Sequence, residues 1–137
     1  MRRILTALLL LCTTLLAGCA TAQRSESLTS TLGAYASTVR WGDFQNALQF
    51  VDPEVRKKHP PSALDMARYE QLRVTGYDDG KGPVPGAENE ARQIVQISLV
   101  NLNTQAERTV IDKQLWRYDP EKKCWWLMSG LPNITSD

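Results

Sequence analysis

Histidine, cysteine and net charge are all scarce in this chain, and each shortage excludes a class of function. His59 is the single histidine among 137 residues, and it lies in a charged, proline-bearing stretch without an adjacent partner. A zinc site or a histidine-based catalytic dyad is therefore not expected. The 16 basic and 15 acidic residues leave a net charge of +1, whereas a nucleic-acid surface usually needs a clear basic excess. We expect no metal, no cofactor and no nucleic-acid partner.

A long apolar run is also missing. The longest one, Ile4 to Leu16, has 13 residues and follows Arg2 and Arg3. A membrane-spanning helix needs roughly 20 apolar residues. A basic start, a short apolar centre and small residues at the end are typical of an export signal that is removed. We assign residues 1–18 to such a signal.

The four residues Leu16-Ala17-Gly18-Cys19 resemble the lipobox of bacterial lipoproteins, position for position. The resemblance implies cleavage between Gly18 and Cys19, a diacylglycerol on the Cys19 sulfur, and acylation (for example by palmitate) of the new amino group. Because Ala20 rather than Asp follows the cysteine, it also implies transfer to the outer membrane, on the periplasmic face. Two or three acyl chains would hold the protein on a bilayer permanently. The alternative is an ordinary secretory signal with a cysteine near its cleavage site.

The cysteine count allows no disulfide within the mature chain. Of the three cysteines, Cys12 lies in the signal and Cys19 would carry lipid, which leaves Cys124. Cys124 stands in an apolar, strand-like run, and we expect a buried structural thiol there rather than a nucleophile.

The mature chain begins with a small polar segment, residues 19–27, which we interpret as a lipidated tether before the domain. Helical spacing then starts at Leu28 and predicts a helix that Ser25 or Ser27 caps and Gly42 ends. A second helix is predicted from Asp43, its N-cap, to Val51. We expect a loop over residues 56–61 and a short third helix opened by a capping arrangement at Ser62-Ala-Leu-Asp65.

The period then changes from 3.6 to 2, which predicts strands. The expected strands cover residues 72–75, 95–99, 109–118 and 124–128, and a long mobile loop rich in glycine and proline covers 76–86. Residues 132–137 are interpreted as a tail. The predicted core consists of Leu32, Tyr35, Phe44, Leu48, Val95, Ile97 and Leu99.

Helices followed by an antiparallel meander predict an α+β domain, in which N-terminal helices pack on a curved antiparallel sheet of about four strands. Residues 28–131 resemble the NTF2-like (cystatin-like α+β) superfamily. The resemblance is carried by the helix pair 35–51 with Trp41-Gly42-Asp43-Phe44 at its junction, by Asp52-Pro53, and by the closing hairpin 115–127. That fold hosts ketosteroid isomerases as well as binding domains without activity, so only a site can decide the function.

Asp112 is the best-placed candidate acid. It shares one face of its strand with Gln114 and Trp116, whereas Ile111 and Leu115 share the other. If the Trp116 face points inward, Asp112 could serve as the base of an isomerase or dehydratase in an apolar cone. We favour the opposite arrangement, which leaves Asp112 in solvent.

Alternation places Trp125 and Trp126 on opposite faces of the last strand. We expect Trp126 in the core and Trp125 exposed as a contact residue. The favoured hypothesis is a non-enzymatic lipoprotein that binds another envelope component. The alternatives are a protein that binds a small apolar ligand among Phe44, Trp116 and Trp126, and an enzyme that uses Asp112.

Overall fold

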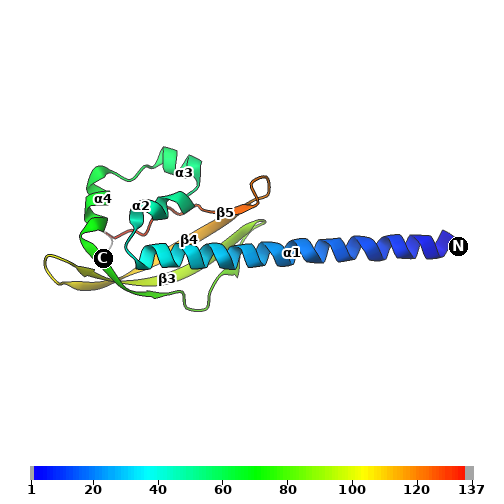
Figure 1. The fold of residues 1–137 in the computed structure, drawn as a ribbon, viewed down its shortest axis with the longest axis horizontal. Helices are drawn as coiled ribbons and strands as arrows, with labels where there is room; N and C mark the ends of the chain where they lie inside the picture. Colours follow the sequence, from blue (N-terminus) through cyan, green and yellow to red (C-terminus); the bar gives the residue numbers. More distant parts are fainter. Residues whose placement is uncertain (1, 135–137) are drawn as a thin grey trace.

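The computed structural model describes the backbone of residues 2–134 and the side chains of residues 18–134. The side chains of residues 1–17, within the expected signal, and residues 135–137 of the expected tail lie outside the described residues. The chain forms helices first and a curled antiparallel sheet second (Figure 1). The elements are α1 (Arg2–Arg40), α2 (Phe44–Ala47), the 3-10 turn η1 (Leu48–Phe50), α3 (Pro53–Lys58), α4 (Ala63–Glu70), β1 (Leu72–Asp78), β2 (Val84–Pro85), β3 (Glu90–Asn101), β4 (Glu107–Asp119) and β5 (Cys124–Leu127).

Helix α1 is continuous from Arg2 to Arg40, so the expected start of a helix near Ser25 or Ser27 is wrong. The expected tether contains neither glycine nor proline after Cys19, and nothing in it breaks the helix. The helix ends as predicted at Gly42, whose φ of +72° suits glycine and whose N–H donates to the Val39 carbonyl at 2.8 Å. Among the described residues, no helix is both long enough and apolar enough to cross a membrane.

The next helical turns correct one expectation. Asp43 caps α2 as predicted, by accepting the Asn46 N–H at 3.1 Å. The predicted second helix is divided into α2 and η1 and ends at Phe50, just before Asp52-Pro53, and this pair also starts the next helix, α3. The Asp52 carboxylate accepts the N–H groups of Glu54 and Val55 at 2.9 and 3.1 Å, and a proline in the first helical turn has no amide hydrogen to leave unpaired. Residues 56–58 are therefore helical, not a loop.

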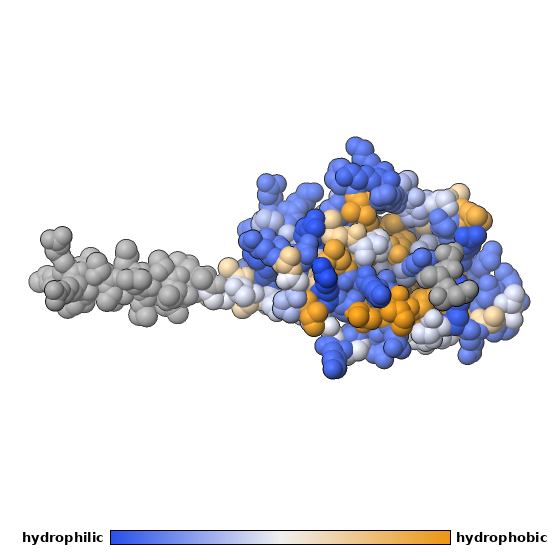
Figure 2. All heavy atoms as spheres, turned by 180° about the vertical axis from the view of Figure 1, so that it is seen from behind, coloured by the Kyte–Doolittle hydropathy of each residue, from blue (hydrophilic) through white to orange (hydrophobic). Residues whose placement is uncertain are grey.

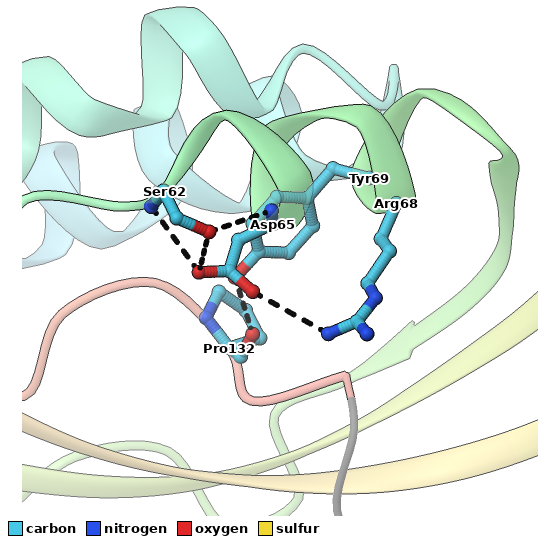
Figure 3. Close-up of polar contacts among 5 residues, drawn as sticks. All are labelled: Ser62, Asp65, Arg68, Tyr69 and Pro132. Carbon is cyan, nitrogen blue, oxygen red and sulfur yellow. Dashed lines mark hydrogen bonds and ion pairs between the residues drawn. The ribbon is translucent and has the colours of Figure 1, made fainter.

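Helix α4 begins with the predicted capping arrangement (Figure 3). The Ser62 hydroxyl accepts the Asp65 N–H at 3.1 Å, and the Asp65 carboxylate accepts the Ser62 N–H at 3.2 Å. At the other end of α4, the Tyr69 hydroxyl donates to the Pro132 carbonyl at 2.7 Å. Pro132 and Ile134 are buried, so the folded domain extends past residue 131 into the expected tail.

The sheet has the order β1-β3-β4-β5, all antiparallel, with the short β2 also paired to β3. The expected long loop over 76–86 is partly wrong, because β1 continues to Asp78 and residues 84–85 form β2. A bulge between Val74 and Gly76 lets the strand continue, and a side chain at Gly76 would lie 3.3 Å from Ser98.

The sheet curls into a half-barrel, and the helices pack against its concave inner face. This arrangement confirms the predicted α+β class with helices on the concave side. Of the predicted core residues, Tyr35, Phe44, Val95, Ile97 and Leu99 are buried, whereas Leu32 and Leu48 are half-buried at its edge.

Candidate functional site

The first candidate site lies on the inner face of β4, inside the half-barrel. Asp112 is only 6% exposed, Gln114 is 2% exposed and Trp116 is fully buried, so the expectation of a solvated Asp112 is wrong. Ile111, on the alternate face, is 53% exposed. The sheet turns its tryptophan face inward because burying Trp116 removes far more apolar area from water than burying Ile111.

A chain of hydrogen bonds joins these side chains. The Trp116 indole donates to Gln114 Oε1 at 3.1 Å, and Gln114 Nε2 lies 2.8 Å from Asp112 Oδ2 and 3.1 Å from the Tyr77 hydroxyl. Gln114 therefore holds the carboxylate and the phenol together. A buried polar chain of this kind specifies one arrangement of the core, because each member would be costly to leave unpaired.

Burial raises the pKa of Asp112 to about 6, and the hydrogen bond from Gln114 partly opposes this rise. Burial also raises the pKa of Tyr77 and of Tyr69 to about 12 each. The pKa of Tyr35 rises further, first through burial and then through the nearby charge of Asp112. Asp112 therefore titrates near neutral pH, whereas Tyr77, Tyr69 and Tyr35 stay protonated.

The sequence did not reveal the tyrosines around Asp112. Tyr77 lies in the glycine-rich stretch for which the sequence predicts a loop, and the helical spacing of Tyr35 predicts only a core residue. The Tyr35 ring packs edge-on against Trp116 with centroids 5.3 Å apart. Its hydroxyl and Gln93 Oε1 are buried and have no hydrogen-bond partner among the described residues. A tyrosine on a helix's apolar stripe is the signal that could have found this, since its hydroxyl needs a partner when buried.

None of the five prominent pockets formed by residues 18–134 is lined by Asp112, Trp116 or Tyr35, whereas Gln114 and Tyr77 each line one of them. Phe44, another predicted pocket residue, is buried and stacks on Tyr69 with ring centroids 4.4 Å apart. Asp112, Trp116 and Tyr35 thus line none of these pockets, and Trp116 contacts Tyr35 and Gln114.

The assignment of the two adjacent tryptophans was reversed. Trp125 is buried at 6% exposure and packs against Tyr118 with centroids 5.3 Å apart. Trp126 is half-buried on the outer face, where the Lys122 ammonium lies 5.4 Å from its ring centroid. Alternation predicted that the two face opposite ways, but helix α1 covers the Trp125 side, which the sequence does not show.

A second candidate site lies on the outer face of the sheet, where a groove of about 700 Å³ opens between the 78–82 loop and strands β3 and β4. Its apolar residues include Val84, Ile94 and Leu115, and its charged residues are Asp78, Asp79, Lys81, Arg92 and Lys113. Val84 is 55% and Ile94 62% exposed. Figure 2 shows the molecule turned by 180° from Figure 1, and on the face in view apolar side chains lie among charged ones.

The cations of this groove have no acidic partner within residues 18–134, since the two ion pairs found there join Arg68 to Asp65 and Arg117 to Glu90. On the loop, the Asp78 carboxylate accepts the Gly80 N–H at 2.9 Å. The groove thus combines an apolar floor with three cations outside these two ion pairs and with the carboxylates of Asp78 and Asp79.

The remaining predicted residues are separate from both sites. Cys19 is exposed on α1, and Cys124 is half-buried rather than buried, with burial raising the pKa of its thiol. His59 is exposed. Among the described residues, no three histidine, cysteine or acidic side chains are grouped to hold a metal ion.

Comparisons with protein-family models, with curated proteins and with solved structures found no match to this chain. The functional argument therefore depends on the residues themselves.

Proposed function

We propose that this protein is a non-enzymatic lipoprotein of the outer membrane that faces the periplasm and binds another envelope protein through an NTF2-like domain. The observation that carries the proposal is the contrast between the two faces of the sheet. The inner residues pack against one another, whereas the outer face is hollowed and exposes Ile94 and Ile111. Exposed apolar groups gathered at a groove favour contact with a partner.

The chemistry of the groove indicates what the partner presents. In the sheet register Ile94 lies opposite Lys113, and Arg92 lies opposite Leu115, so apolar and basic side chains alternate across the groove. A protein segment with an apolar side chain beside an acidic one would fill the floor and pair with these cations. The rim ion pairs would set register and orientation more than affinity.

The lipid anchor is tested by replacing Cys19 with serine. Because the thioether would be the attachment point, Cys19→Ser should abolish incorporation of labelled palmitate and remove the protein from the outer-membrane fraction. Cys124→Ser is the matched control and should leave both unchanged. A mature wild-type protein whose mass shows an unmodified Cys19 would rule out the anchor.

The contact surface is tested with a photo-crosslinking amino acid at Ile94. Leu64, an apolar residue on α4 that is 60% exposed, is the control position. We expect one crosslinked envelope protein from position 94, none from position 64, and at least a several-fold loss of the crosslink when Lys113→Glu reverses the charge beside it. Equal crosslinking from both positions, or none from position 94, would contradict the proposal.

The second candidate is the enzyme hypothesis, which one observation favours. Asp112 is a buried carboxyl with a pKa of about 6, and Tyr77 lies within hydrogen-bonding reach of the same Gln114 amide. A carboxylate base with phenolic donors in an apolar cone is the arrangement that isomerase chemistry needs. An isomerase or dehydratase activity that Asp112→Asn abolishes, while the fold is retained, would replace the contact role by this one.

A further inference from the structure

The expected tether between the lipid site and the domain is helical, and one of its residues is bound to the domain. Arg24 Nη1 donates to Asn89 Oδ1 at 2.7 Å, and the guanidinium lies 4.5 Å from the centroid of the Tyr118 ring. The Trp125 indole donates to the Arg24 carbonyl at 3.3 Å. These contacts, which we call the Arg24 latch, join α1 to the residue before β3, to β4 and to β5.

The latch lies close to the acylation site along the chain. Cys19 precedes Arg24 by five residues on the continuous helix α1, and five residues at 1.5 Å each span about 7.5 Å. The same five residues as an extended linker would span up to about 17 Å and allow any orientation of the domain. A helix fixed at Arg24 keeps Cys19 close to the domain and holds the domain in one orientation relative to Cys19.

The figure shows which end of the domain this places near the lipid. The β4–β5 turn and the start of β3 lie at the end from which α1 leaves toward the N-terminus, whereas α4 and the β3–β4 turn lie at the opposite end (Figure 1). Strand β4 has 13 residues, so the two ends are separated by about 40 Å.

We propose that the Arg24 latch holds the domain upright on the membrane, with the β4–β5 turn against the phospholipid headgroups. This inference rests on the proposed acylation of Cys19. The turn presents Glu121, Lys122 and Lys123, all exposed, and the half-buried Trp126 stands beneath Lys122. Charges of both signs next to a tryptophan suit zwitterionic headgroups, which carry both a phosphate and an ammonium group.

The orientation also restricts the partner. Strands β3 and β4 run beside α1 in Figure 1, so their outer groove opens to the side when α1 rises from the membrane. A partner would therefore reach Ile94 laterally, within about one domain length of the bilayer.

The test measures the height of two points above the bilayer. In a Cys124→Ser background, the acylated protein is labelled with a fluorophore at Lys122→Cys or at Thr104→Cys. Each is inserted into vesicles of phosphatidylethanolamine and phosphatidylglycerol that contain a headgroup-labelled acceptor lipid. We expect energy transfer at position 122 to exceed that at position 104 several-fold. Arg24→Ala should bring the two values toward equality, and Arg108→Ala, an exposed arginine near the far end, should not.

The outcomes separate this inference from the proposed function. Protein without acyl groups by mass spectrometry, or protein that does not bind the vesicles, would refute the anchor itself. Acylated, vesicle-bound protein with equal transfer at both positions would refute the latch and leave the anchor in place. If Arg24→Ala impairs folding, the wild-type comparison of positions 122 and 104 still decides.

Discussion

Replacing Trp116 with alanine should lower the free energy of unfolding by about 3 to 5 kcal/mol. The side chain is fully buried, packs edge-on against Tyr35 and donates a hydrogen bond to Gln114. The truncation would leave a large cavity and an unpaired Gln114 oxygen. Since a domain of this size has only about 5 to 15 kcal/mol of stability, the loss is a large share of the total.

Denaturant unfolding followed by circular dichroism measures this effect. Trp41→Ala is the matched control, because Trp41 is 87% exposed and its removal should change stability by less than about 0.5 kcal/mol. A Trp116→Ala protein as stable as the Trp41→Ala protein would show that the inner face is not packed as described.

The second large effect is a dependence of stability on pH that originates from Asp112. Its pKa is raised to about 6 in the folded protein, against about 3.9 in an unfolded chain. Between these values the folded state binds more protons than the unfolded state, so the free energy of unfolding falls as the pH rises. Two pKa units correspond to about 3 kcal/mol, lost between about pH 4 and pH 6 and absent at every higher pH.

Asp112→Asn should remove this loss, since an amide stays neutral and its oxygen can still accept the Gln114 hydrogen bond. The variant should be more stable than the wild type at pH 8 by up to about 3 kcal/mol and nearly equal at pH 4. Urea unfolding at the two pH values measures the difference. Asp65→Asn is the control with the opposite pH dependence of stability, because hydrogen bonds from Ser62 lower the pKa of Asp65. Its wild-type contribution is therefore lost as the pH falls. If the free energy of unfolding of Asp112→Asn differed from that of the wild type by the same amount at both pH values, the raised pKa of the buried Asp112 would be contradicted.

The sequence predicted the local structure where short-range chemistry is unambiguous. Asp43 and Ser62 cap helices as expected, Gly42 ends α1, and the alternation along β3 and β4 is correct. The same rules missed the helix that starts at Asp52-Pro53, because this pair can follow the end of one helix and also start the next. They also failed at Gly76, because a glycine can mark either a loop or a strand bulge.

The sequence predicted only part of the inner candidate site. Alternation placed Asp112, Gln114 and Trp116 on one face, but it could not show that this face is the buried one. Tyr77 and Tyr35 join them from β1 and α1, 35 and 77 positions away from Asp112. Sequence spacing carries no information on such distant contacts.

The sequence by itself determined the α+β class, the order of helices before strands, and which residues share a face, because periodicity and caps depend on near neighbours along the chain. Tertiary structure alone decided which face of β4 is inside, which of Trp125 and Trp126 is covered, and that the segment after Cys19 is latched by Arg24. Each of these depends on what another element packs against, and burial is a property of the assembled layers rather than of any one strand or helix.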